Sequence, residues 1–183
     1  LEPTFGAINL EDIKAPECFV VEKALRKRMK IPVFHDDQHG TAIVAGAAIS
    51  NGLRVVGKEL KDVKLVATGG GAASLACLDL LVSLGLRKEN ITLVDLEGVV
   101  FTGRKKDMNI YKDKYARDTT KRTLDDAMNG VDVFLGLSAP GILKPSMVKN
   151  MAKKPFILAL ANPTPEITPE EAKKIRPDAV IAT

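Results

Sequence analysis

Aromatic residues and cysteines are scarce in the sequence, and long apolar runs are missing. Phenylalanine, tyrosine and tryptophan make up 4% of the 183 residues, whereas proteins that bind single-stranded nucleic acid depend on stacked aromatic side chains. No apolar run approaches the ~20 residues needed to cross a bilayer, and no signal peptide is visible. Nucleic-acid and membrane partners are therefore not expected. Cys18 and Cys77 stand apart in predicted helices, so we expect reduced thiols in a cytoplasmic protein.

The composition and charge are those of a soluble globular domain. Hydrophobic residues make up 45% and charged residues 27% of the chain, and the formal net charge is +4. Basic residues gather at 23–30, which we interpret as the solvated face of a helix, and at 104–122, in a connection that could approach a cofactor phosphate. Because the chain starts at Leu1 without methionine and stops directly after an apolar run, we expect both ends to be cuts through a longer protein.

The segment from Lys64 to Asp95 predicts a unit that binds a dinucleotide. It contains a short apolar strand, a glycine turn, an amphipathic helix and a second strand that ends in an acid. Gly69 would permit the tight turn and Gly71 the close approach of a pyrophosphate, whereas Ser74 replaces the usual third glycine or alanine. The predicted contacts are Gly69, Gly70, Gly71, Ala72 and Ala73 for the diphosphate and Asp95 for the ribose. A glycine-rich turn in an ordinary α/β protein is the alternative.

Strands and helices alternate through most of the chain. Strands are predicted at 64–68, 91–95, 131–137, 156–161 and 179–182, and helices at 15–30, 123–130, 146–152 and 169–175. The apolar segment 41–57 predicts a further helix that is buried on most of its faces. This order is typical of an α/β fold with a doubly wound parallel sheet, Rossmann-like, in which the loops after the strands form the site. Ser138, in a turn after one of these strands, is a further candidate for cofactor binding.

Two pairs of acids precede the glycine turn, and each pair follows a short apolar run. Glu11 and Asp12 follow one run, and Asp36 and Asp37 follow the other, so both pairs could lie at the same edge of a sheet. Carboxylates that come together repel each other unless a cation relieves them, and an all-oxygen ligand set suits Mg²⁺ or Mn²⁺. The alternative is that these acids are solvated and cap the helices that follow. Zinc at the two histidines of HDDQHG is a weaker hypothesis because a third ligand is missing.

Four separated motifs resemble those of the malic enzymes. They are INLEDIKAPECF (residues 8–19), IPVFHDDQHGTAIV (31–44), the glycine turn (69–74) and ALANPTPEI (159–167), and they occur in the same order over essentially the whole chain. The resemblance is closest to the bacterial branch that prefers NADP. It implies oxidative decarboxylation of L-malate to pyruvate and CO₂ with NAD(P)⁺ and Mg²⁺ or Mn²⁺, in an enzyme expected to be a homo-oligomer.

The resemblance also implies roles for individual residues. Glu11, Asp12 and Asp37 match the metal ligands of the family, and Asp36 matches the acid beside them, which makes it the one catalytic candidate in this chain. Asn162 matches an asparagine at the end of the pocket that holds the substrate and the nicotinamide.

The same resemblance divides the chain after residue 40. Residues 1–40 would end the region that binds metal and substrate, and residues 41–183 would form the NAD(P)-binding domain. The family's general base, a lysine, and its general acid, a tyrosine, belong before the LED motif and have no match in this chain. We therefore expect the chain alone to bind nucleotide, to hold a metal weakly and to turn over little or no malate.

Two other functions and the choice of cofactor stay open. The chain could belong to another NAD(P)-dependent dehydrogenase, or it could be a nucleotide-sensing or assembly module without chemistry of its own. Asp95 favours a free 2′-hydroxyl and hence NAD⁺, whereas Arg104, Lys105 and Lys106 could meet the 2′-phosphate of NADP⁺ or could form a solvated loop. Only the resemblance favours NADP⁺.

Overall fold

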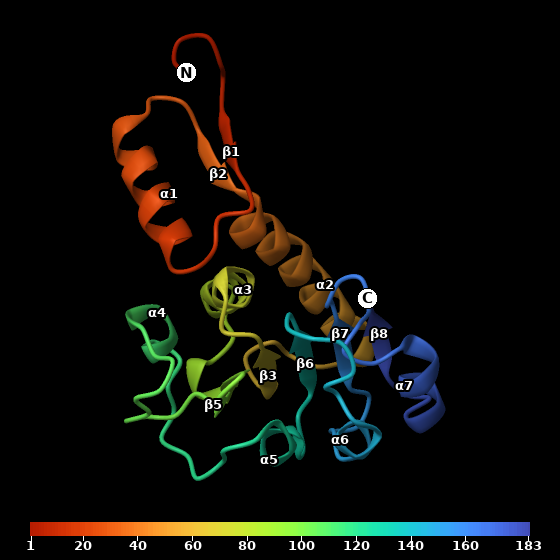
Figure 1. Cartoon of the computed structure of the whole chain (residues 1–183). Helices are drawn as coiled ribbons and strands as arrows, with labels where there is room; N and C mark the ends of the chain where they lie inside the picture. The colour runs from red at the N-terminus through yellow and green to blue at the C-terminus, as the bar shows by residue number, and fades with distance from the viewer.

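The computed structural model describes residues 1–183 and places the strands in two separate sheets (Figure 1). The small sheet pairs β1 (Ile8–Leu10) with β2 (Val33–His35) in parallel, and α1 (Glu17–Arg28) lies beside it. The large sheet has the order β5-β4-β3-β6-β7-β8. Its strands are β3 (Leu65–Thr68), β4 (Ile91–Asp95), β5 (Gly98–Val99), β6 (Val133–Gly136), β7 (Phe156–Ala159) and β8 (Val180–Ala182).

Helices cover both faces of the large sheet, so the predicted doubly wound α/β fold is confirmed. In Figure 1, α2 and α3 lie on one side of the sheet and α5 and α6 on the other. The helices are α2 (Thr41–Val56), α3 (Ala72–Ser83), α4 (Ile110–Asp113), α5 (Leu124–Met128), α6 (Pro145–Lys149) and α7 (Pro169–Ile175), with a π-helical turn η1 (Asp36–Gly40) and a 3-10 turn η2 (Lys88–Asn90). None of these helices is both long enough and apolar enough to span a membrane.

Successive residues of each central strand enter two different cores. In β3, Leu65 and Ala67 pack with α2 and α3, whereas Val66 packs on the opposite face with residues of α5, α6 and α7. The same alternation holds in β6 and β7. A parallel strand that is buried on both faces needs apolar residues at every position, and this is why these strands appear in the sequence as continuous apolar runs.

The predicted burial of α2 is only half right. Ala45, Ile49 and Leu53 are buried, but Val44 and Val55 are 71% and 78% exposed on the opposite face. The buried face also carries the small residues that let the helix approach α3 and β7 closely. No other part of this chain covers the exposed apolar face, so the apolar character of the segment overestimated how much of the helix is buried.

The connection between β4 and α5 contains two elements that the sequence did not predict. β5 pairs with β4 in the antiparallel direction, which departs from an all-parallel sheet. The short helix α4 begins after Asn109, whose side chain accepts hydrogen bonds from two backbone N–H groups of its first turn. By contrast, the helix predicted at 123–130 is present as α5, which Thr123 caps in a capping box with Asp126. Both cysteines are free and buried.

Two glycines on the buried face of α2 yield a test of this close packing. A Cβ at Gly52 would lie 2.7 Å from the ring of Phe156 on β7, whereas a Cβ at Gly46 would lie 3.0 Å from the flexible tip of Leu80. We expect Gly52→Ala to lower the free energy of unfolding by about 1–3 kcal/mol, although alanine favours a helix by about 1 kcal/mol. Gly46→Ala is the matched control and should change stability less. Urea unfolding of both variants measures the difference, and equal effects would contradict it.

Candidate functional site

The glycine turn lies where the order of the large sheet reverses. β3 has β4 on one side and β6 on the other, and the turn follows its C-terminal end. Gly69 adopts φ +96°, and a Cβ there would overlap the carbonyl oxygen of Leu137. Gly71 caps α3 at φ −89°, and a Cβ there would meet nothing within 4 Å. The turn therefore needs glycine at residue 69 for its shape, and it leaves open space at residue 71, before the N-terminus of α3.

A groove of about 960 Å³ runs along the carboxyl ends of β3, β4 and β6. Of the predicted cofactor residues, Gly69, Gly70, Asp95 and Ser138 line it. Those that do not line the groove are Gly71, Ala72, Ala73 and Asn162; the first three begin α3, and Asn162 is exposed in the loop after β7. The structure thus brings the turn, the acid of β4 and the serine after β6 to one groove. It places Asn162 outside that groove.

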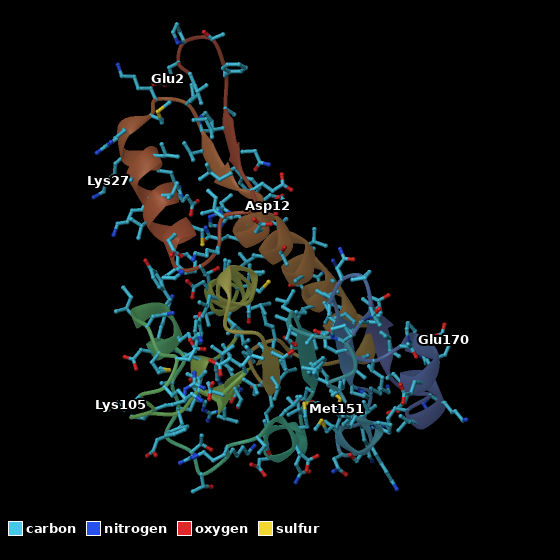
Figure 2. The ribbon with its side chains drawn as sticks, viewed as in Figure 1. Glu2, Asp12, Lys27, Lys105, Met151 and Glu170 are labelled. Atoms are coloured by element: carbon cyan, nitrogen blue, oxygen red, sulfur yellow. The ribbon has the colours of Figure 1, made fainter.

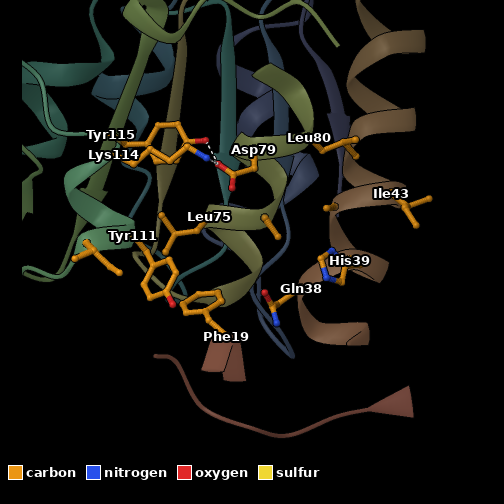
Figure 3. Close-up of a pocket in the computed structure, with 13 residues that line it drawn as sticks. Phe19, Gln38, His39, Ile43, Leu75, Asp79, Leu80, Tyr111, Lys114 and Tyr115 are labelled. Atoms are coloured by element: carbon orange, nitrogen blue, oxygen red, sulfur yellow. Dashed lines mark hydrogen bonds and ion pairs between the residues drawn. The ribbon is translucent and has the colours of Figure 1, made fainter. Parts of the chain in front are cut away.

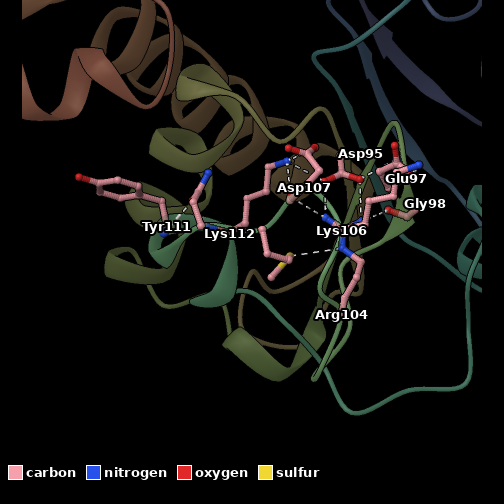
Figure 4. Close-up of polar contacts among 10 residues, drawn as sticks. Asp95, Glu97, Gly98, Arg104, Lys106, Asp107, Tyr111 and Lys112 are labelled. Carbon is pink, nitrogen blue, oxygen red and sulfur yellow. Dashed lines mark hydrogen bonds and ion pairs between the residues drawn. The ribbon is translucent and has the colours of Figure 1, made fainter.

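The carboxylate of Asp95 is held by two cations (Figure 4). Arg104 donates to both oxygens, at 2.7 and 2.5 Å, and Nζ of Lys112 donates to Oδ2 at 2.9 Å. The Asp95 side chain is only 4% exposed. Burial alone would raise the pKa of Asp95, but the hydrogen bonds from Arg104 and Lys112 outweigh burial and hold this pKa below its usual value.

The predicted basic run divides into one buried and two exposed residues. Arg104 is buried, whereas Lys105 and Lys106 are exposed, and Lys106 pairs with Glu97 at 2.7 Å; Figure 2 shows Lys105 on the outer loop. The second cation of the groove is instead Lys112, which the sequence analysis missed. Asparagine at residue 109 before IYKD was the one local signal for the helix that carries it.

The four acids of the small sheet lie at the same end of two parallel strands, as predicted. The backbone N–H of Asp12 donates to Oδ2 of Asp37 at 2.9 Å, and Asp12 itself adopts φ 57°. Glu11 and Asp36 are exposed, and no group of three or more His, Cys, Asp or Glu side chains is arranged to hold a metal ion. The structure therefore brings Asp12 and Asp37 together but does not gather the three predicted ligands around one point.

The two histidines of HDDQHG have different surroundings. Nε2 of His39 lies 2.6 Å from Oε1 of Glu22 on α1, so this ring joins η1 to α1. His35 is completely buried and neither of its ring nitrogens has a hydrogen-bond partner. The rings therefore do not form the pair of ligands that a zinc site would need.

A second cavity of about 590 Å³ lies between α1, α2, α3 and α4 (Figure 3). The rings of Phe19 and Tyr111 pack across it with centroids 4.1 Å apart. Asp79 accepts a hydrogen bond from the hydroxyl of Tyr115 and one from Lys114. Burial, together with the neighbouring Asp79 carboxylate, raises the pKa of Tyr115 above its usual range, so this phenol stays protonated. Asp79, Lys114 and Tyr115 are thus engaged with one another on one wall of this cavity.

The sheet order and the groove define a class of protein. Parallel strands in this order, with a glycine turn at the point of reversal and an acid at the end of the next strand, form a dinucleotide-binding domain of the Rossmann type. Residues 38–183 match the family described as malic enzyme, NAD binding domain. The chain belongs to the malic enzyme family.

Individual relatives agree with this family. The chain is 61% identical over 183 residues to the NAD-dependent malic enzyme of Rhizobium meliloti (strain 1021) and 62% identical over 184 residues to the NADP-dependent malic enzyme of Haemophilus influenzae. Each match covers all of this chain but 24% of the relative. The crystal structure of the NAD-dependent malic enzyme from Thermotoga maritima superposes with a TM-score of 0.91 at 41% identity, over 99% of this chain and 49% of that one.

The environment of Asp95 predicts a pH-dependent contribution to stability. Because the folded-state pKa of Asp95 is lowered, its contribution is present above the unfolded pKa of about 3.9 and is lost as the pH falls through the folded value. We expect Asp95→Asn to cost about 3 kcal/mol at pH 7, since Arg104 and Lys112 lose their buried counter-charge. Urea unfolding from pH 7 to pH 3 should show that the variant loses less stability below pH 4 than the wild type.

Asp113→Asn is the matched control for this experiment. Asp113 is exposed on α4, next to Lys112, and forms no ion pair, so its substitution should leave both the stability and its pH dependence nearly unchanged. If Asp95→Asn behaves like this control, the carboxylate of Asp95 does not hold the two cations in solution.

Proposed function

We propose that this chain is the cofactor-binding part of an enzyme that oxidatively decarboxylates L-malate to pyruvate and CO₂, with NADP⁺ or NAD⁺ accepting the hydride. One observation carries the proposal: in a chain of the malic enzyme family, the glycine turn opens into a groove along the carboxyl ends of β3, β4 and β6. A dinucleotide binds across such a point of strand reversal.

The groove suggests how the cofactor would lie. The first N–H groups of α3 have no partner within the helix, and the helix dipole favours negative charge there, so the diphosphate would sit at this N-terminus. The adenosine ribose would then lie toward Asp95 on β4. The other half of the dinucleotide would extend over β6 and β7, toward Ser138 and Asn162.

We favour NADP⁺ as the cofactor. Relatives named for NAD and for NADP match the chain almost equally, at 61% and 62% identity, so names do not decide the choice. Arg104 and Lys112 bring two cations to the end of β4, and Lys112 lines the groove. A 2′-phosphate is attracted by such cations, whereas a 2′-hydroxyl would have to compete with them for Asp95.

A divalent metal, Mg²⁺ or Mn²⁺, is part of the proposal. Glu11, Asp12 and Asp37 supply the carboxylate oxygens that these ions take, and Asp36 would lie beside them in the active site. As they stand, these side chains do not form a ligand group. Donor chemistry and the sequence resemblance alone therefore support them as ligands.

We also propose that the protein is cytoplasmic and homo-oligomeric. Its two cysteines are free and buried, which suits a reducing compartment. The exposed apolar residues Ile43, Val44 and Val55 on α2 offer a surface that a second subunit could cover.

Gly71 offers a test of nucleotide binding that does not disturb the fold. Its φ is one that any residue adopts, and a side chain there meets open space. We expect Gly71→Val to fold normally but to weaken NADPH binding by at least about tenfold, because the side chain would occupy the place where the pyrophosphate approaches. Quenching or enhancement of NADPH fluorescence, titrated with the purified chain, measures the affinity. NADH should be titrated in parallel.

Gly6→Val is the matched control for this titration. Gly6 also has open space around its would-be Cβ but lies in the exposed N-terminal segment, far along the chain from the turn. Its substitution should leave NADPH binding unchanged. Equal affinities of the wild type and the Gly71→Val variant would overturn the proposed position of the diphosphate.

The proposed reaction can be tested in a chimera. Residues 1–183 would replace the matching segment of the NADP-dependent malic enzyme of Escherichia coli, which is 61% identical over 184 residues. We expect the chimera to reduce NADP⁺ when L-malate and Mn²⁺ are supplied, and the isolated chain to show little or no turnover because the expected lysine and tyrosine have no match in it. Absorbance at 340 nm follows the reaction.

The chimera carrying Gly71→Val should lose this activity, which ties turnover to the groove. If the chimera folds and binds NADPH but does not oxidise malate, the decarboxylation proposal fails. The chain would then be better described as a nucleotide-sensing module.

A further inference from the structure

The carboxyl ends of β6 and β7 hold a buried carboxylate that has no cationic partner. Glu166 is 0% exposed. Its Oε1 accepts a hydrogen bond from the backbone N–H of Ser138 at 3.0 Å, and its Oε2 accepts one from the backbone N–H of Ala161 at 3.1 Å. The hydroxyl of Ser138 lies 3.4 Å from Oε1. Burial of a carboxylate is costly, and uncharged donors alone compensate it here.

The backbone around Glu166 is shaped to admit this side chain. Gly136, the last residue of β6, pairs with Thr68 of β3 and with Ala159 of β7. A Cβ at Gly136 would overlap the carboxyl carbon and both carboxylate oxygens of Glu166. The carboxylate therefore occupies the space that a side chain at the centre of these three strands would otherwise fill.

Glu166 connects three segments at the edge of the groove. The hydroxyls of Ser138 and Thr68 are 2.8 Å apart, and each carries one hydrogen, so Thr68 can donate to Ser138 while Ser138 donates to Glu166. Thr68 and Ser138 both line the groove. Ala161 immediately precedes Asn162. One side chain from the loop after β7 thus fixes the floor of the groove and the loop that carries Asn162.

We propose that Glu166 is a positioning residue that shapes the nicotinamide half of the groove and, through its buried negative charge, favours the oxidised cofactor over the reduced one. This inference rests on the proposed cofactor function. With the adenosine ribose toward Asp95, the nicotinamide half lies over β6 and β7, where Glu166 is buried. The oxidised nicotinamide ring is positively charged and the reduced ring is neutral. Because the Glu166 side chain is completely buried, water screens its charge little, and the carboxylate stabilises the oxidised form selectively.

Glu166→Gln tests the charge with little change of shape. The amide has one oxygen and one NH₂ group, so one of the two backbone N–H groups would face a donor in place of an acceptor. We expect the substitution to weaken the binding of NADP⁺ about tenfold and to weaken the binding of NADPH less. The dissociation constant of NADP⁺ divided by that of NADPH should therefore rise at least about threefold. Calorimetric titration with NADP⁺ and fluorescence titration with NADPH give both constants.

Glu170→Gln is the matched control, because Glu170 is an exposed glutamate in the first turn of α7. It removes the same charge from the neighbouring helix and should leave the ratio unchanged. If Glu166→Gln weakens both nucleotides equally, Glu166 has a structural role alone and the proposed charge effect is overturned. If the wild-type chain binds neither nucleotide, the proposed cofactor function itself fails.

A measurement on the wild-type chain covers the case in which Glu166→Gln does not fold. The amide signals of Ser138 and Ala161, assigned by nuclear magnetic resonance, should shift when NADP⁺ is added and should shift differently with NADPH, because both N–H groups bond to the Glu166 carboxylate. If the Gly71 signal responds to the nucleotide while these two do not, Glu166 lies outside the influence of the nicotinamide and the inference is wrong.

Discussion

The close approach of the glycine turn to the neighbouring strand ends is the constraint on which the groove depends. The N–H of Gly69 donates to the carbonyl of Val94 on β4 at 2.8 Å, while the space above its Cα is filled by the carbonyl of Leu137, just after β6. The turn is therefore held between the two strands that flank β3. Because α3 begins directly after this turn, the same contacts fix where its N-terminus lies, and any side chain at residue 69 would displace the start of the helix.

The two ends of the groove differ in charge balance. At the end of β4, Asp95 is neutralised by Arg104 and Lys112, and Asp107 also contacts Lys112. At the ends of β6 and β7, Glu166 is buried among uncharged donors. An oxidised dinucleotide phosphate carries its extra negative charge on the ribose and a positive charge on the nicotinamide. The cations at the end of β4 are already balanced by Asp95 and Asp107, so the uncompensated anion at the other end, Glu166, is the charge that complements this distribution.

The sequence predicted the features that local signals encode. The glycine turn, the strands that flank α3 and the limits of α7 could be predicted because glycines, caps and short apolar runs mark them within a few residues. Lys112 and Glu166 could not be predicted in this way. Lys112, which contacts Asp95, lies in a connecting segment whose apolar residues show no regular periodicity. Glu166 accepts a hydrogen bond from Ser138, 28 residues earlier in the chain. Contacts of this kind are set by the tertiary fold, which brings strand ends together, and no local pattern records them.

The geometry of η1 explains why the predicted metal ligands do not converge. Asp36 and Asp37 are neighbours in the chain, yet their carboxylates point to different partners: that of Asp37 accepts the N–H of Asp12, and that of Asp36 folds back over Gly40, where a Cβ would overlap it. The hydrogen bond to Asp12 uses Oδ2 alone, so Oδ1 of Asp37 stays available to an ion without loss of that bond. A cation at this edge would therefore have to draw in Glu11 and Asp12, whose side chains are exposed, and would leave the contact between the two strands intact.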